Sequence, residues 1–206
     1  MIAKLHYITQ DHLPISHAAQ AKLALEGGVK WVQFRSKVLT ELEIRSEALI
    51  IKELCKTYGA TCILNDNWQL AIDLDLDGVH VGLNDTPIEV IRMQTDFIIG
   101  GTANTFKDIQ LHYSQGANYV GVGPYCYTET KKNLSPVLGG DGFKKIIFDC
   151  KKAAINLPVI AIGGIQLSDI QTIKNLGVYG VAIASQINKA KNPTLSAQEF
   201  IAYLAK

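Results

Sequence analysis

The sequence has almost no net charge. Its 206 residues include 20 Lys and Arg against 19 Asp and Glu, which leaves a formal charge of +1 at pH 7. A protein without an excess of one sign has no overall field that would attract nucleic acid or an anionic membrane. We therefore expect no nucleic-acid or membrane partner, and any anion must be bound by a local arrangement of side chains.

Cysteines are few, and they form no recognisable metal or redox motif. The four cysteines, Cys55, Cys62, Cys126 and Cys150, include no C-x-x-C pair. This argues against a zinc site and against dithiol chemistry. It favours reduced, mostly buried thiols of the kind found in cytosolic proteins. The sequence also lacks a P-loop, a serine nucleophile elbow and a Cys–His pair.

Long apolar segments are missing as well. Residues 1–12 contain no apolar core of a secretion signal. The longest stretch free of Asp, Glu, Lys and Arg is Ile109–Thr128, and it is interrupted by His112, Asn118 and Pro124. Such a stretch does not form a membrane span. We expect a cytoplasmic protein.

Short β-branched or aromatic runs alternate with longer segments of helical period along the chain. In Thr40–Tyr58, apolar residues recur every three to four positions, and Thr40 followed by Glu43 forms a capping box that starts a helix. The expected strands are Leu5–Ile8, Trp31–Phe34, Thr61–Leu64, Gly78–Val81, Phe97–Gly100, Tyr119–Val122, Val159–Ile162 and Gly180–Ala184.

This alternation predicts parallel strands joined by right-handed helical crossovers. Strands such as Val159–Ile162 are apolar on both faces, as a sheet covered by helices requires. Eight units fit a compact (β/α)8 barrel formed by a single domain over residues 1–206. A doubly wound open sheet is the alternative.

A basic face follows the second expected strand. Gln33, Arg35 and Lys37 share one face of an extended chain. A guanidinium fork beside a mobile ammonium suits a diphosphate. The alternative is a solvated charged turn, but the face begins inside an apolar strand, which favours binding.

Carboxylates follow the third and fourth expected strands. Asp66 and Asp85 would lie at neighbouring strand ends, facing the basic residues. Mg²⁺ commonly takes one or two carboxylates together with waters and substrate phosphates. The alternative is helix capping, by Asp66 ahead of Trp68–Leu74 and by Asp85 near Pro87.

Hydroxyls and small residues follow the remaining strands. Thr102 comes after the fifth strand and either binds a ligand or caps the next helix. Gly164 after the seventh strand and Ala184-Ser185 after the eighth match the backbone phosphate cup of such barrels. Tight packing of small residues is the alternative for this group.

The longest connection, Pro124–Gly140, follows the sixth expected strand. A loop of this length in a compact domain is commonly functional. Two hydroxyls and an ammonium, on Thr128, Thr130 and Lys131, can together grip an anion or a polar heterocycle.

Taken in order, these residues resemble the thiamine phosphate synthase family. The matching pieces span roughly residues 33 to 185, and the ordered set is specific although each piece alone is weak. They are Gln33–Lys37, Asn65-Asp66, Asp77–Asp85, Gly100–Thr102, Gly121–Pro124, Thr128–Lys131, Ile162–Ile165 and Ala184-Ser185.

The resemblance implies a barrel transferase that joins 4-amino-2-methyl-5-(diphosphooxymethyl)pyrimidine to a (carboxy)thiazole ethyl phosphate. The products would be thiamine phosphate and diphosphate. The sequence is compatible with a homo-oligomer. The resemblance implies that the pyrimidine diphosphate is bound by Gln33, Arg35, Lys37, Asn65, Thr102 and Lys131, of which Arg35, Lys37 and Lys131 would be catalytic. It implies that Mg²⁺ is bound by Asp66 and Asp85. It implies that the thiazole phosphate is bound by Thr128, Thr130, Gly164, Ala184 and Ser185.

Two positions depart from the family pattern, and two other functions remain as alternatives. Ser36 stands where the family usually has Glu and should point away from the basic face, whereas Thr102 stands where Ser is common and should tighten the pocket by one methyl group. His80, on an apolar strand, is interpreted as a core residue rather than a base. The alternatives are a thiazole tautomerase, which would not need the diphosphate clamp, and a non-catalytic barrel that binds a phosphorylated ligand.

Overall fold

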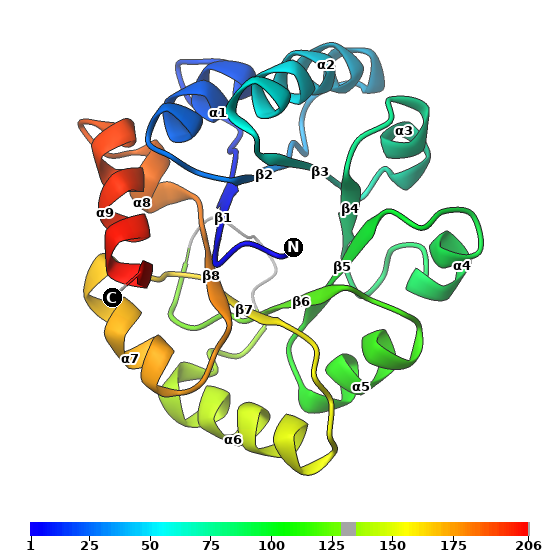
Figure 1. The fold of residues 1–206 in the computed structure, drawn as a ribbon, viewed down its shortest axis with the longest axis vertical. Coiled ribbons are helices and arrows are strands. Elements are labelled where there is room, and N and C mark those ends of the chain that lie inside the picture. The colour runs from blue at the N-terminus through cyan, green and yellow to red at the C-terminus, as the bar shows by residue number, and fades with distance from the viewer. Residues whose placement is uncertain (129–134, 206) are drawn as a thin grey trace.

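Eight parallel strands close into a barrel in the computed structural model, which describes residues 1–128 and 135–205 (Figure 1). The spatial order of the strands follows the sequence, and the last strand pairs with the first in the register Leu5↔Val181. A closed barrel confirms the expected (β/α)8 fold and excludes the doubly wound open sheet, because an open sheet would leave two unpaired edges.

Helices follow the strands and lie on the outside of the barrel (Figure 1). The strands are β1 (Leu5–Ile8), β2 (Trp31–Phe34), β3 (Thr61–Asn65), β4 (Gly78–Val81), β5 (Ile98–Ala103), β6 (Tyr119–Val122), β7 (Val159–Ile162) and β8 (Gly180–Ile183). The helices are α1 (His17–Glu26), α2 (Glu41–Tyr58), α3 (Trp68–Asp73), α4 (Ile88–Arg92), α5 (Phe106–Ser114), α6 (Gly139–Lys152), the 3-10 turn η1 (Leu167–Asp169), α7 (Ile170–Asn175), α8 (Ser185–Asn188) and α9 (Pro193–Ala205).

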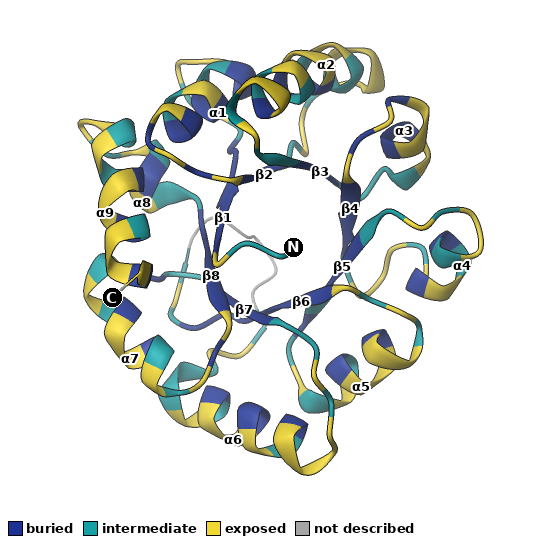
Figure 2. Ribbon diagram, viewed as in Figure 1, coloured by how far each residue is buried: buried dark blue, intermediate teal, exposed yellow. Residues whose placement is uncertain are grey.

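Side chains of the strands alternate between two cores. Outward residues such as Val32 and Val81 pack against the inner faces of the helices, and inward residues such as Ile63 and Ile160 fill the barrel. Figure 2 shows the result as a buried ring of strands inside helices that are buried on one face and exposed on the other. Apolar residues on both faces of each strand are what a sheet covered by helices requires.

The amino-terminal end of the barrel is filled by aromatic rings. His6 stacks on Trp31 with ring centroids 4.2 Å apart, and Tyr119 packs edge-on against Trp31 at 5.4 Å. Ile2 and Ala3 pack against the same cluster. Because this end is filled, a ligand site in the barrel has to lie at the carboxyl ends of the strands.

Strand β5 is longer than the sequence predicted. The expected strand was Phe97–Gly100, but Gly100 pairs with Tyr119 in the middle of Ile98–Ala103. A Cβ atom at Gly100 would lie 2.1 Å from Cζ of Tyr119, so this glycine makes room for a neighbouring ring instead of ending the strand. Thr102 therefore lies on the strand.

The remaining boundaries differ by one or two residues. β3 includes Asn65, β8 ends at Ile183, and α6 begins at Gly139, two residues earlier than expected. The capping box at the start of α2 is confirmed, since the Thr40 hydroxyl accepts from the backbone of Glu43 and the Glu43 carboxylate accepts from the backbone of Thr40.

The expectations about thiols and membrane spans can be compared with the described residues. Cys55, Cys62 and Cys150 are buried and Cys126 is half-buried, and all four are free thiols, as predicted. Within residues 1–128 and 135–205, no helix combines the length and the hydropathy that crossing a membrane demands.

Candidate active site

A cavity of about 520 Å³ opens at the carboxyl ends of the strands. All eight strands, or the loops that follow them, contribute to its wall. Its volume is in the range that holds a small organic ligand. In the described part of the chain, its charged lining residues are Arg35, Lys37, Asp66 and Asp85.

The cavity brings together the site residues that the sequence predicted. Thr130 and Lys131 lie outside the described residues. All the others line the cavity, namely Gln33, Arg35, Lys37, Asn65, Asp66, Asp85, Thr102, Thr128, Gly164, Ala184 and Ser185.

The lining has two chemically different sides. The charged residues follow β2, β3 and β4, which are neighbours in the barrel. Hydroxyls and small residues follow β6, β7 and β8, and they include Thr128, Gly164 and Ser185. Charge on one side and backbone and hydroxyl donors on the other can hold two ligands side by side.

Lys37 and Asp66 form an ion pair across the ends of β2 and β3. Asp66 has a left-handed backbone conformation with φ of 67°. It does not cap α3, because Asn67 does so by accepting from the backbone N–H of Leu70 at 3.0 Å. The capping alternative for Asp66 is therefore wrong, and the carboxylate faces the cavity.

Asp85 folds back over the end of β4. Its Oδ2 accepts from the backbone N–H of Gly82 at 2.6 Å, and a Cβ atom at position 82 would lie only 2.9 Å from that oxygen. Helix α4 begins after Pro87 without a side-chain cap, so the capping alternative for Asp85 is wrong too. In the described chain, no group donates a hydrogen bond to the other carboxylate oxygen of Asp85.

Asp66 and Asp85 suit a metal that is shared with a ligand. The described residues contain no cluster of three or more His, Cys, Asp or Glu that could enclose a metal ion. Mg²⁺ does not need such a cluster, since it commonly takes one or two carboxylates, keeps waters and completes its shell with phosphate oxygens. The donor set therefore fits Mg²⁺ bound together with a phosphorylated compound.

Gln33 and Asn65 form an amide pair on the same wall. The Gln33 side-chain N–H donates to Oδ1 of Asn65 at 2.8 Å. This bond fixes both amide orientations. The Asn65 amide hydrogens and the Gln33 carbonyl oxygen are then left to meet a ligand.

Thr102 is linked to the barrel interior through His80. His80 is buried and contacts the Tyr119 hydroxyl at 3.0 Å through Nδ1 and the Thr102 hydroxyl at 3.1 Å through Nε2. Burial raises the pKa of Tyr119, so the phenol stays protonated. A neutral imidazole that accepts from this phenol at Nδ1 donates from Nε2 to the Thr102 hydroxyl. The Thr102 hydroxyl hydrogen then faces the cavity.

His80 and Thr102 each match the prediction only in part. His80 is a hydrogen-bonded core residue, as predicted, but it also reaches the cavity wall. Thr102 does not cap α5, because Thr105 does so. The capping alternative for Thr102 is therefore wrong.

The glycines after β7 allow a close approach of the loop that follows β6. Gly164 has a φ of 64°, and a Cβ atom there would lie 2.5 Å from the carbonyl oxygen of Tyr127. The backbone N–H of Cys126 donates to the Gly163 carbonyl at 2.9 Å. These glycines therefore pack tightly against the segment that leads to Thr128, and Gly164 also lines the cavity.

Ser36 points away from the cavity, as predicted. Its hydroxyl donates to Oδ1 of Asp11 at 2.5 Å, and it is not among the lining residues.

Other lining residues were missed by the sequence reasoning. Thr9 and Gln10 directly follow β1, and Asn104 directly follows β5, so the rule that active sites collect at strand ends could have identified them. Ser135 lies in the long loop after β6, where no sequence pattern distinguishes it.

Known proteins resemble this chain over nearly its whole length. The family model described as thiamine monophosphate synthase matches residues 5–187. A thiamine-phosphate synthase of Phocaeicola vulgatus is 45% identical over 192 residues, covering 92% of each chain. One of Bacteroides fragilis is 47% identical over 191 residues, covering 92% of this chain and 94% of the relative. The solved thiamine phosphate pyrophosphorylase of Pyrococcus furiosus superposes with a TM-score of 0.87 at 28% identity, covering 98% of this chain and 95% of the other.

Proposed function

The chain belongs to the thiamine monophosphate synthase family and is a transferase of thiamine biosynthesis, and from this premise we propose how its cavity carries out the condensation. The pyrimidine diphosphate binds on the charged side formed after β2, β3 and β4, and the thiazole phosphate binds on the side formed after β6, β7 and β8. The segregated lining of one cavity carries this proposal.

On the charged side, Arg35 and Lys37 neutralise the diphosphate. A guanidinium fork binds two oxygens at once, and an ammonium adds a mobile point charge. Asp66 and Asp85 would hold Mg²⁺. The ion, when bound, supplies further positive charge to the departing oxygens. Lys131, which lies outside the described residues, is proposed to add another cation.

The pyrimidine ring is oriented by neutral groups. Asn65 offers amide hydrogens, Gln33 offers a carbonyl oxygen, and Thr102 offers a hydroxyl hydrogen fixed by His80. A 4-aminopyrimidine carries both donors and acceptors, so such a mixed set can orient it without any charged contact.

The thiazole phosphate meets a different set of groups. Thr128 and Ser185 offer hydroxyls, and Gly164 and Ala184 offer the backbone at close range. Thr130 belongs to the proposed set but lies outside the described residues. Holding the thiazole next to the pyrimidine removes much of the entropic cost of a two-substrate reaction.

The chemistry needs no proton-transfer residue. The bond between the pyrimidine methylene carbon and the diphosphate oxygen breaks, and its electron pair leaves with the diphosphate. The thiazole nitrogen uses its lone pair to form the new bond to that carbon. Since no proton moves, fixed positive charge around the diphosphate is the main contribution of the protein, and such prearranged charge can supply several kcal/mol.

A product assay tests the proposal. The purified protein should form thiamine phosphate and diphosphate from the two substrates with Mg²⁺, and should form neither product when Mg²⁺ is removed by a chelator. Calorimetry with each substrate alone identifies the alternatives. Binding without product would indicate a non-catalytic barrel, and a change in the thiazole phosphate alone would indicate a tautomerase.

Localisation and assembly stay predictions. We propose a cytoplasmic enzyme, which fits the free thiols and the small-molecule substrates. A homo-oligomer remains compatible with the sequence.

A further inference from the structure

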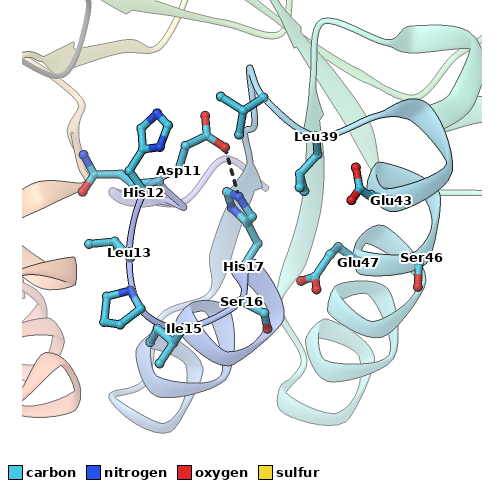
Figure 3. Close-up of a pocket in the computed structure, with 13 residues that line it drawn as sticks. Asp11, His12, Leu13, Ile15, Ser16, His17, Leu39, Glu43, Ser46 and Glu47 are labelled. Carbon is cyan, nitrogen blue, oxygen red and sulfur yellow. Dashed lines mark hydrogen bonds and ion pairs between the residues drawn. The ribbon is translucent and has the colours of Figure 1, made fainter.

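Two side chains just after β1, Thr9 and Asp11, bind the loop that carries Arg35 and Lys37, and His17 at the start of α1 supports them. The backbone N–H of Arg35 donates to the Thr9 hydroxyl at 3.0 Å, and the backbone N–H of Lys37 donates to Oδ2 of Asp11 at 2.9 Å. His17 joins the two acceptors, with Nδ1 2.8 Å from the Thr9 hydroxyl and Nε2 3.2 Å from Oδ1 of Asp11. Figure 3 shows Asp11 and His17 facing each other beside the start of α1.

The hydrogen-bond directions in this cluster follow from the charge states of its members. Burial lowers the pKa of His17, which favours the neutral ring. An ionised Asp11 carboxylate only accepts, so the neutral ring donates to it from Nε2 and accepts at Nδ1 from the Thr9 hydroxyl at 2.8 Å, while the Arg35 carbonyl lies farther from the same hydroxyl, at 3.5 Å. The Thr9 oxygen is then left to accept from the backbone of Arg35. Burial works to raise the pKa of Asp11, but hydrogen bonds from Ser36 and Lys37 and the contact with His17 outweigh it and lower the pKa.

Because these groups are buried, breaking their hydrogen bonds to the loop costs free energy, and the loop is held in one position. Thr9 is fully buried, and the side chains of His17 and Asp11 are only 8% and 9% exposed. A buried acceptor that loses its donor incurs a desolvation cost, so the loop cannot move away without leaving unsatisfied groups.

The loop lies beyond the strand ladder at this point. The ladder between β2 and β3 ends at the pair Phe34↔Leu64, so Arg35 and Lys37 lie beyond the last strand pairing. In place of the ladder, two backbone bonds join the loop to the cluster, alongside the Ser36 hydroxyl on Asp11 and the ion pair of Lys37 with Asp66. The side chains of both residues line the cavity from this held backbone.

We propose that Thr9, Asp11 and His17, here called the β1 clamp, are positioning residues for diphosphate binding. They act through the backbone of Arg35 and Lys37, and Asp11 and His17 do not touch the substrate. Both lie on the wall of a separate cavity of about 450 Å³, outside the candidate site (Figure 3). The inference rests on the proposed function, because it takes the role of Arg35 and Lys37 from there.

Steady-state kinetics test the clamp with Asp11→Asn and His17→Phe. Each removes part of the hydrogen-bond set while keeping the shape of the side chain. We expect KM for the pyrimidine diphosphate to rise by about tenfold, as expected for one lost hydrogen bond to a charged group. KM for the thiazole phosphate should stay within about twofold, because the groups after β6 to β8 are untouched. His17→Gln, which keeps a donor for Asp11, should recover part of the loss.

Asp77→Asn is the matched control. The Asp77 carboxylate also accepts a hydrogen bond from a backbone N–H, that of Cys62, at 2.7 Å. This bond lies at the amino end of β3, at the other end of the strand from the candidate site. This variant should leave both KM values unchanged, so a general loss of stability cannot imitate the clamp effect. Equal rises in both KM values for the Asp11 and His17 variants would overturn the proposal.

Amide hydrogen exchange without substrate tests the clamp independently of the reaction. Exchange at residues 35–39 should be about tenfold faster in Asp11→Asn than in Asp77→Asn, because an amide oxygen accepts from the Lys37 backbone more weakly than a carboxylate does. Unchanged exchange there would also overturn the proposal. If the wild-type protein makes no thiamine phosphate, the proposed function fails, and the exchange rates alone then uphold or overturn the clamp.

Discussion

Replacing Asp66 with Asn removes one negative charge from the cavity and changes little else. Asn has nearly the same shape as Asp and tolerates the left-handed backbone found here, where φ is 67°. Ala would add backbone strain at this position and confuse a loss of function with a loss of stability. The variant also frees Lys37, the ion-pair partner of Asp66.

The expected cost in stability is small. The side chains of Lys37 and Asp66 are 54% and 30% exposed, and ion pairs that solvent screens to this degree contribute at most about 1 kcal/mol. A change of that size shifts Tm by about 2–4 °C for a chain of this length.

The expected cost in activity is much larger. Asp66 is one of two carboxylates proposed to hold Mg²⁺, and stabilisation of the leaving diphosphate by the ion is worth several kcal/mol. Loss of about 3 kcal/mol would lower kcat/KM by about a hundredfold. The effect on activity should therefore far exceed the effect on Tm.

The chain offers a closely matched control in Asp75→Asn. Asp75 is also left-handed, with φ of 50°, and it pairs with Lys52 at 3.1 Å, but it is 97% exposed and does not line the cavity. The assay is kcat/KM for thiamine phosphate formation as a function of Mg²⁺ concentration, together with Tm. Wild-type kinetics in Asp66→Asn, or equal losses in both variants, would refute the metal assignment.

Two further predictions concern the barrel interior. Thr102→Val should raise KM for the pyrimidine diphosphate by up to about tenfold, because one neutral hydrogen bond contributes about that much to binding. Thr102→Ser keeps the hydroxyl and should have a KM near that of the wild type. Equal KM values for the two variants would contradict this. Burial, with a smaller effect of charge on His80, lowers the pKa of His6 from 6.5 to about 3. The neutral form is favoured in the folded state, so stability is complete above pH 6.5 and falls as the pH drops toward 3, by up to about 1.4 kcal/mol per unit. His6→Phe should flatten this dependence in urea unfolding between pH 7 and 4, and parallel curves for the two proteins would contradict it.

The barrel could be predicted because its main determinants are local. Apolar runs such as Val159–Ile162 and the capping box of Thr40 and Glu43 are legible without knowledge of any distant residue. The end of β5 could not be predicted in this way. Gly100 reads as a strand end until the ring of Tyr119, nineteen residues further on, is known to lie against it.

The sequence predicted which residues of the candidate site lie together, but not how their side chains pair. The rule that active sites collect at strand ends grouped Arg35, Asp66 and Asp85 correctly, since it depends only on strand order. It did not predict the pairing of Lys37 with Asp66, which depends on how far two side chains reach. The sequence also assigned the two residues to different partners, diphosphate for one and metal for the other.

That pairing fits a cavity that is balanced before its ligands arrive. Among the described lining residues, the positive charges of Arg35 and Lys37 offset the negative charges of Asp66 and Asp85. The lining therefore has no net charge that would attract an anion or a cation on its own. A diphosphate alone would meet two carboxylates, and a metal ion alone would have to displace Lys37 from Asp66. Mg²⁺ held by the two carboxylates would leave Lys37 to the phosphate oxygens, so each ligand would remove the obstacle to the other. Since linkage is reciprocal, the diphosphate would strengthen metal binding by the same factor as the metal would strengthen diphosphate binding. Two carboxylates supply only part of the oxygen shell that Mg²⁺ takes, which favours its binding together with a phosphorylated substrate.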